Sequence, residues 1–413
     1  MISIPNIIPN STFFYSKSTF CVHRQSLSRR HLLRAEKMSE ETSASPSLTE
    51  IPHFPERQII IGVGGVGVDY LATVTNFPKP DDKIRSTNLK VQGGGNTGNA
   101  LTCAARLGLK PRLISKVAND AQGSSILSEL EADGVDTSYI VVSKEGNSPF
   151  TYIIVDNETN SRTCIHTAGY PPMVPADLFQ SSLFSALDGA KLAYFDVRLH
   201  EAALVVAKEA FQKNIPILVD AERKREGLDD LLNLASYVVC TEKFPQTWSE
   251  APSIPSALVA MLLRLPNIRF VIVTLGERGC IMLERSVVEP PSTQEAKVDI
   301  VLEKLQKEIN SSTYHPICIS SKSSLRLSAD GIGTVNGKVY LGTAEKIPSS
   351  ELIDTTGAGD AFIGAILYAL CTGMPPEKML PFASEVAASG CRALGARTGL
   401  PFYTDSRLAH FLQ

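Results

Sequence analysis

A glycine-rich turn followed by a carboxylate lies directly before an apolar stretch in the C-terminal part of the chain. The turn reads Asp-Thr-Thr-Gly-Ala-Gly-Asp over residues 354–360, and residues 363–370 are almost entirely apolar. Such a turn at the start of a helix presents unpaired backbone N–H groups and the positive end of the helix dipole, which together favour a developing phosphate charge. Asp360 would lie in the first helical turn, where it can accept a proton from a hydroxyl group attacking a γ-phosphoryl group. The alternative is a structural one, in which Asp360 only caps the helix.

A second glycine-rich turn precedes another predicted helix. Residues 93–100 read Gly-Gly-Gly-Asn-Thr-Gly-Asn-Ala, and helical spacing continues over residues 99–107. Glycines allow a ligand to approach the backbone, and the two asparagine amides supply both donors and acceptors, as a polyhydroxylated ligand requires. Alone, this sequence also suits an ordinary turn. Its occurrence together with the first turn favours a binding site.

The elements that must position these turns alternate between short apolar runs and amphipathic stretches. The runs are predicted to be buried strands and lie at residues 58–63, 112–117, 191–195, 215–219, 237–240 and 270–274. The amphipathic stretches are predicted to be helices and lie at residues 124–133, 202–212, 228–235 and 257–265. This alternation predicts an α/β fold with a doubly wound, mostly parallel sheet flanked by helices.

Further strands fall outside this alternation. Residues 68–76 and 84–91 alternate in polarity, and residues 150–155 and 162–167 form a hairpin-like pair. They predict a small second sheet, with strands about 68–92 and 148–168. Residues 285–330 interrupt the pattern and are predicted to form a mobile surface insertion.

The two turns resemble the signatures of a known family. Residues 94–108 are similar to the N-terminal signature of the PfkB carbohydrate kinases, and residues 354–360 to their C-terminal signature. The resemblance covers roughly residues 58–405 and is strongest to the ketohexokinase-like members, which share paired asparagines. It implies a ribokinase-like fold with a β-sheet lid and transfer of phosphate from ATP to a small sugar, a ketose or a pentose. A nucleoside kinase of the same family, or a non-catalytic PfkB-like protein that binds partners in a plastid complex, remains an alternative.

The resemblance also implies roles for individual residues. Asp360 would be the catalytic base, and the backbone of Gly357, Ala358 and Gly359 would form an anion hole. The acceptor would be bound by Asp69, Gly95, Asn96 and Asn99. The turn around ATP would include Thr274, Gly276 and Gly279. Asp354 and Gly395 match the region that binds a monovalent cation, K⁺, in many members.

The sequence does not identify the protein ligands of Mg²⁺. Many family members carry an Asn-x-x-Glu motif after a central strand, but residues 238–244 read Val-Val-Cys-Thr-Glu-Lys-Phe. Because Mg²⁺ is held largely by nucleotide phosphates and water, ATP and Mg²⁺ are still expected as cofactors. Glu242 is the carboxylate within residues 238–244, where the motif would be expected.

Two further short motifs could indicate binding sites, but the surrounding sequence supports such a role less strongly. Residues 62–67 match G-x-G-x-x-G, but the following residues are a poor helix, so a dinucleotide-binding fold is not expected. The basic residues 223–225 either contact a substrate phosphate or form a solvated loop.

Composition limits the class of protein. The chain has 413 residues, of which 43% are hydrophobic and 20% charged, with a net charge of −3. It offers no bulk attraction to nucleic acid and no apolar run of about 20 residues that would cross a membrane. Its eight cysteines form no CxxC pair, which argues against a zinc site. The family resemblance makes a homodimer formed through the lid plausible.

The N-terminal segment differs from the rest. Residues 1–35 contain no acidic residue, several basic ones and many hydroxyl groups, which is typical of a transit peptide. Residues 1–55 are therefore predicted to be a transit peptide and a flexible linker, and residues 56–413 a kinase domain. A chloroplast is the first expectation, with a mitochondrion as the alternative, or the cytosol if translation begins at Met38.

Overall fold

A computed structural model describes residues 58–159, 161–287, 295–309 and 313–412. The expected transit peptide and linker lie outside the described residues. Within the described ranges, no helix has the length and apolar character to span a bilayer.

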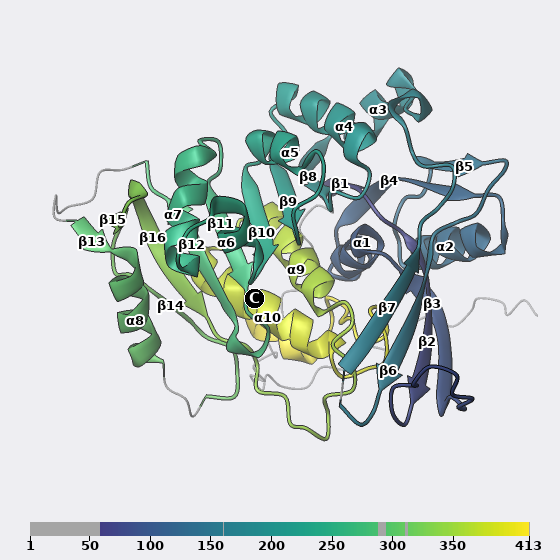
Figure 1. Ribbon diagram of the computed structural model, residues 1–413. Helices are drawn as coiled ribbons and strands as arrows, with labels where there is room; N and C mark the ends of the chain where they lie inside the picture. The colour runs from purple at the N-terminus through teal and green to yellow at the C-terminus, as the bar shows by residue number, and fades with distance from the viewer. Residues whose placement is uncertain (1–57, 160, 288–294, 310–312, 413) are drawn as a thin grey trace, which may run out of the picture. The chain divides into compact units, whose positions relative to one another are not determined.

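The larger sheet runs through the centre of the described domain (Figure 1). Its strand order is β13-β15-β16-β12-β11-β10-β9-β8-β1-β4-β5, with β14 also pairing with β16. These strands are β1 (Ile59–Val63), β4 (Lys110–Ala118), β5 (Ile140–Ser143), β8 (Ala190–Phe195), β9 (Ile217–Ala221), β10 (Tyr237–Thr241), β11 (Phe270–Thr274), β12 (Cys280–Arg285), β13 (Glu295–Lys297), β14 (Cys318–Ser320), β15 (Leu325–Ala329) and β16 (Gly333–Gly342). The strands from β11 to β5 are parallel, as the alternation of elements predicts.

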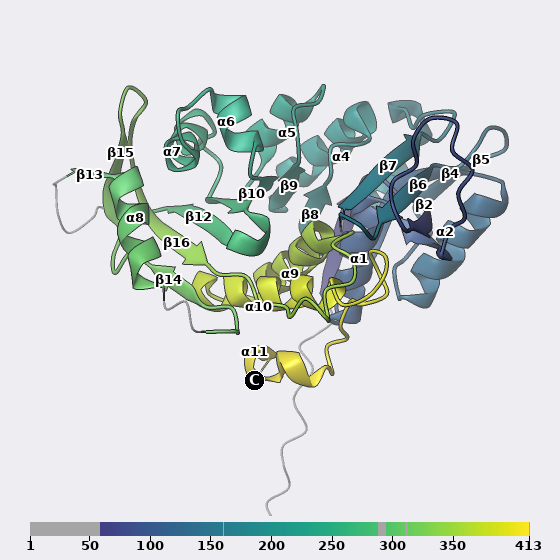
Figure 2. The ribbon, with the colours of Figure 1, turned by 60° about the horizontal axis from the view of Figure 1, so that its bottom comes forward.

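Helices cover both faces of this sheet (Figure 2). They are α1 (Asn96–Arg106), α2 (Ala121–Ala132), α3 (Gln180–Leu187), α4 (His200–Gln212), α5 (Leu228–Leu234), α6 (Phe244–Ser249), α7 (Ile254–Arg264), α8 (Val298–Glu308), α9 (Ala358–Thr372), α10 (Pro376–Gly390) and α11 (Ala409–Leu412). Successive side chains of β1 point to opposite faces: Ile60 lies in the core with α1, α9 and α10, whereas Ile61 lies in the core with α4, α5 and α7. Burial on both faces explains why the strands read as continuous apolar runs. The doubly wound α/β prediction is confirmed.

The second sheet is also present. Its order is β3 (Asn88–Gly94), β2 (Gly67–Val74), β6 (Phe150–Asp156) and β7 (Ser161–Thr167). The pairs β2–β3 and β6–β7 are antiparallel, whereas β2 and β6 are parallel. One face buries Leu71, Ile153 and Val155 against Leu394. We call this sheet the lid.

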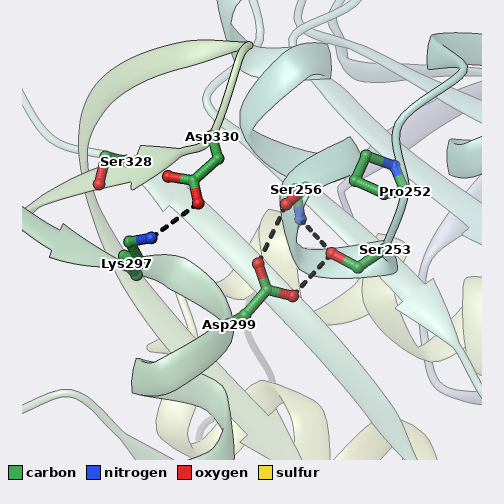
Figure 3. A pocket seen from close by; sticks show the side chains of 7 residues that line it. All are labelled: Pro252, Ser253, Ser256, Lys297, Asp299, Ser328 and Asp330. Atoms are coloured by element: carbon green, nitrogen blue, oxygen red, sulfur yellow. Dashed lines mark hydrogen bonds and ion pairs between the residues drawn. The ribbon is translucent and has the colours of Figure 1, made fainter.

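The segment 285–330 is partly built into the main sheet. Its described residues form α8 and the strands β13, β14 and β15, of which β14 and β15 pair with β16. Asp299, in the first turn of α8, accepts hydrogen bonds from Ser253 Oγ at 2.7 Å and Ser256 Oγ at 3.0 Å, at the start of α7 (Figure 3). These bonds attach α8 to the domain, so the described part of the segment extends the sheet edge. Residues 288–294 and 310–312 lie outside the described residues.

Candidate active site

The reversal of strand order in the main sheet lies at β1. β4 pairs with one side of β1 and β8 with the other, and all three run parallel. Ligands of doubly wound sheets bind in the crevice at the carboxyl ends of strands at such a point. The chain reaches Gly64 and Gly65 directly after β1, and Asp196 directly after β8.

Asp196 organises the backbone at this point. Its Oδ2 accepts from the amide of Gly65 at 2.7 Å and of Thr97 at 3.2 Å, and its Oδ1 accepts from the amide of Arg198 at 3.0 Å. A Cβ atom on Gly64 would lie 2.1 Å from Asp196 Oδ1, so only glycine fits there. The carboxylate thus holds the end of β1 against the start of α1.

The two glycine-rich turns meet above these strand ends. Gly95 (φ 86°) precedes α1, and Gly357 (φ 76°) precedes α9, both in the conformation that glycine adopts most readily. Asn99 Nδ2, in the first α1 turn, donates to Asp360 Oδ2 at 2.8 Å. The structure therefore brings together two motifs that are 261 residues apart in the sequence.

Asp360 has the environment of a proton acceptor. It lies in the first turn of α9, as predicted. Burial raises the pKa of its carboxyl from 3.8 to about 7, the amide of Asn99 lowers it, and the nearby carboxylates of Asp196, Glu222 and Asp69 raise it. A pKa near neutrality suits a general base.

The glycine turn beside Asp360 forms the start of α9. The first N–H groups of a helix lack intrahelical partners. Of the expected anion hole, the Ala358 amide donates to Thr355 O at 3.3 Å, and a Cβ atom on Gly359 would meet nothing within 4 Å. The open space at Gly359 leaves the helix start accessible to a ligand.

The orientation of Asn99 is fixed by a residue that the sequence did not reveal. Arg397 is buried, and it donates from Nε to Asn99 Oδ1 at 2.9 Å and from Nη2 to Gly94 O at 3.0 Å. Because a guanidinium only donates, this contact leaves the Nδ2 group of Asn99 facing Asp360.

Asp69 lies on β2 with its side chain close to the same turn. A Cβ atom on Gly94 would be 2.3 Å from Asp69 Cγ, so the glycine permits this approach. Burial raises the pKa of Asp69 to about 6, while Arg397 and a hydrogen bond with Thr151 lower it. Asn96 lies at the first position of α1 and contacts Asp220, whose pKa burial raises well above its usual value.

The expected monovalent-cation region joins two turns. Asp354 Oδ1 accepts from Thr356 N at 2.9 Å and Thr356 Oγ1 at 2.7 Å, and Oδ2 accepts from Gly395 N at 2.8 Å. Both carboxylate oxygens are thus used to hold the Gly395 turn against the anion-hole turn.

We expect Asp354→Ala to lower the free energy of unfolding by about 2–4 kcal/mol, since three hydrogen bonds to a charged acceptor are lost and a buried amide is left unpaired. Urea denaturation followed by circular dichroism measures this change. Asp354→Asn keeps the acceptor oxygen and should recover more than half of the loss. Equal stability of wild type and the alanine variant would contradict the prediction.

The expected nucleotide turn lies further along the sheet. Thr274 ends β11, Gly276 begins a 3-10 turn, and Gly279 has φ 84° with no room for a Cβ atom beside Gly342 O. β11 is four strands from β1, or about 19 Å at the usual strand spacing. Asp360 lies closer to the middle of this row, near Asp196 and Glu222, which follow β8 and β9.

The described residues do not assemble a metal site made of protein ligands alone. In the part of the chain that the structure describes, no three His, Cys, Asp or Glu side chains come together as metal ligands. Glu242, which follows β10, is paired with Arg278 at 2.5 Å in the nucleotide turn. Its carboxylate is thus engaged by an arginine, and no protein ligand is assigned to Mg²⁺.

Sequence reasoning missed several site residues. They are Asp196, Arg198, Asp220, Glu222 and Arg397. The first four lie at the carboxyl ends of β8 and β9 or just beyond. Polar residues at the ends of predicted parallel strands were the signal that could have found them.

Comparison with known proteins identifies the family. The pfkB family carbohydrate kinase profile matches residues 60–301 and 323–402. Ribokinase from Mus musculus is 23% identical over 365 residues, covering 86% of this chain and 96% of the relative. Ketohexokinase from Mus musculus is 20% identical over 351 residues, covering 82% and 98%.

Solved structures share the fold. A putative ribokinase from Agrobacterium tumefaciens superposes with a TM-score of 0.62 at 22% identity, covering 84% of this chain and 95% of that one. Arabidopsis thaliana ribokinase, complexed with ribose and ATP, gives a TM-score of 0.60 at 18% identity, covering 86% and 99%. The chain therefore belongs to the pfkB family of carbohydrate kinases and is a kinase whose acceptor is an alcohol.

Proposed function

We propose that this protein transfers the γ-phosphoryl group of ATP to a hydroxymethyl group of a small sugar, a ketose or a pentose, with Asp360 as general base. The observation that carries the proposal is the 2.8 Å hydrogen bond between Asn99 and Asp360. It joins the turn at residues 93–100, which suits a polyhydroxylated ligand, to the turn at residues 354–360, which suits a phosphate group. Ribokinase and ketohexokinase relatives support a sugar acceptor. A nucleoside kinase from Methanothermobacter thermautotrophicus, 27% identical over 105 residues, supports the alternative acceptor.

In the proposed reaction, the acceptor hydroxyl lies beside Asp360 and donates to Oδ1, while Oδ2 keeps its hydrogen bond from Asn99. The hydroxyl oxygen attacks the γ-phosphorus while Asp360 takes its proton, the new O–P bond forms, and the bond from the γ-phosphorus to the bridging oxygen of ADP breaks. The first N–H groups of α9, at Gly357–Asp360, stabilise the negative charge on the transferring group. Asp69, Gly95 and Asn96 hold the remaining hydroxyls.

The nucleotide would lie along the strand ends between the Thr274–Gly279 turn and Asp360. Mg²⁺, bound to the phosphates and water, neutralises phosphate charge when present. K⁺ would need backbone carbonyls of the Asp354 and Gly395 turns, because the carboxylate oxygens of Asp354 already accept hydrogen bonds.

The activity should depend on pH through Asp360. Because the base must be ionised and its pKa is about 7, kcat/KM should fall about tenfold for each pH unit below 7 and level off above it. A pH profile from 5 to 9 with saturating ATP measures this. A profile that is flat from pH 5 to 7 would argue against Asp360 as the base.

The function is tested by measuring ADP release by the chain from Met38 onward, with Mg²⁺ and K⁺, against ketoses, pentoses and nucleosides. Turnover with a sugar supports the proposal, and turnover with nucleosides alone supports the alternative. Absence of turnover with every acceptor, together with absence of ATP binding, would favour the non-catalytic, partner-binding alternative.

Two further proposals concern the setting of the enzyme. Exposed apolar side chains on the lid, Leu89, Val91, Tyr152 and Ile165, support a homodimer through this sheet, which sedimentation velocity would test. The composition of residues 1–35 supports import into a chloroplast, which imaging of a fluorescent fusion would test.

A further inference from the structure

Three arginines converge on one carboxylate beside the candidate acceptor site. Glu222 Oε2 lies 2.8 Å from Arg198 Nη2, 3.5 Å from Arg225 Nη2 and 3.9 Å from Arg223 Nε. Arg198 follows β8, and the other three residues follow β9. We call these four residues the arginine cluster.

The arginine cluster adjoins the residues assigned to the acceptor. Arg198 Nη2 donates to Asn96 Oδ1 at 3.4 Å, at the first position of α1. Arg198 also follows Asp196 by two residues, at the strand end that holds Gly65 and Thr97. The guanidinium of Arg198 is therefore within reach of a ligand bound at Asn96.

The lid places the arginine cluster at one end of the site. Asp69, Thr151 and His166 pair side by side on β2, β6 and β7, so their side chains lie on one face of the lid. His166 is two strands from Asp69, or about 10 Å. Arg198 and Arg225 are close enough to His166 to lower its pKa, after burial as the main cause. Arg198 and Arg225 therefore lie toward the His166 side of the lid, with Asp69 two strands away from His166.

The arginine cluster carries more positive charge than its own carboxylate balances. Three guanidinium groups surround a single carboxylate. Two further acidic groups lie at these strand ends. Asp196 already accepts three backbone amides, and Asp220 is hydrogen-bonded to Asn96 and has a pKa that burial raises well above its usual value. Burial, and then repulsion from Arg198 and Arg223, lowers the pKa of Arg225. Like charges held together at a half-buried site are relieved by an anionic ligand.

We propose that the acceptor carries an anionic group, a phosphate ester or a carboxylate, at the end away from the hydroxyl that is phosphorylated, and that Arg198 and Arg225 bind it. This inference rests on the proposed kinase function and narrows its substrate class. A guanidinium group can bind either a phosphate ester or a carboxylate through two parallel N–H donors, so both groups would be recognised in the same way. Glu222 keeps the guanidinium groups in position before the acceptor binds.

Three acceptors of similar size test the inference: D-fructose, D-fructose 6-phosphate and 2-keto-D-gluconate. Each has a free hydroxymethyl group, and the last two carry a phosphate or a carboxylate. We expect kcat/KM to be at least about tenfold higher for one of the anionic acceptors than for fructose. Preference for the phosphate or for the carboxylate identifies the group. Preference for fructose would overturn the inference while leaving the kinase function intact.

Arg225→Gln should raise the KM for the anionic acceptor about 10- to 100-fold, with the KM for ATP and the turnover of fructose unchanged. The matched control is Lys224→Gln, which removes the same charge from the neighbouring exposed side chain and should change nothing. Arg198→Lys provides a second variant that keeps the charge but loses the planar fork. An equal loss for charged and neutral acceptors in Arg225→Gln would overturn the inference.

Calorimetric binding of the three sugars in the presence of ADP gives a readout that needs no turnover. Tighter binding of an anionic sugar that is lost in Arg225→Gln supports the inference even if no acceptor is phosphorylated, in which case the proposed function alone fails. Equal binding of fructose and both anionic sugars would reject it.

Discussion

Asp360→Asn is expected to lower kcat by about 10²–10⁴-fold, while the Kd for ATP stays within about twofold of wild type. The amide has the shape of the carboxyl group, and its oxygen can still accept from Asn99 Nδ2, so the turn should keep its structure. What is lost is the capacity to take the hydroxyl proton. Single-turnover phosphoryl transfer and ATP binding measured on the same preparation separate the two effects.

Thermal unfolding of the same variant provides an internal control. The pKa of Asp360 is raised in the folded protein, so folding loses stability as pH rises from about 4 to about 7 and the buried group ionises. Above pH 7 the asparagine variant should therefore be more stable than wild type, by up to about 4 kcal/mol, and near pH 4 the two should be similar. A variant that is both inactive and less stable at pH 8 would indicate a structural role.

Gly357→Ala is expected to lower kcat by about 10²–10³-fold, through displacement of the N–H groups at the start of α9. Gly357 has φ 76°, and a Cβ atom there would lie 2.5 Å from Ala396 Cβ and 2.8 Å from Ala396 Cα. The turn must shift to avoid this contact, which moves the donors away from the transferring phosphoryl group. Steady-state kinetics with saturating ATP and acceptor measure the effect.

Gly331→Ala is the control for backbone strain in this experiment. Gly331 has a similar φ, 73°, but a Cβ atom there meets nothing within 4 Å, and the residue lies between β15 and β16 at the sheet edge. It should lose about 1 kcal/mol of stability and keep its kcat. If both alanine variants lose stability equally and both retain kcat, Gly357 has no part in phosphate stabilisation.

A hydrogen bond connects the lid directly to the glycine-rich turn at residues 354–360, which affects the outcome expected for Gly357→Ala. Arg162 Nη1, on β7, donates to Thr355 Oγ1 at 2.6 Å. Movement of the turn at Gly357 would therefore reach the lid, and the KM for the acceptor is expected to rise together with the fall in kcat.

The amino-acid sequence determined the central sheet, its helices and the two glycine-rich turns. The runs at residues 191–195 and 270–274 became β8 and β11 because apolar strands buried on both faces need no alternation. One boundary differs from the prediction: the helix predicted at 99–107 begins at Asn96, since the turn is already completed by Gly95, which has a positive φ of 86°. The two glycine-rich motifs were therefore sufficient to select Asp360 and Asn99 as candidate site residues.

Only the tertiary structure decided which distant groups share the site. The contact of Asn99 with Asp360, the fixing of Asn99 by Arg397 and the convergence of three arginines on Glu222 depend on strand order and helix packing. Segment 285–330 shows the same limit, because β14 and β15 pair with β16, which lies outside the segment. Hydrophobic periodicity is local and can be read along the chain, whereas hydrogen bonds and ion pairs between segments up to 308 residues apart exist only after the sheet has set their positions.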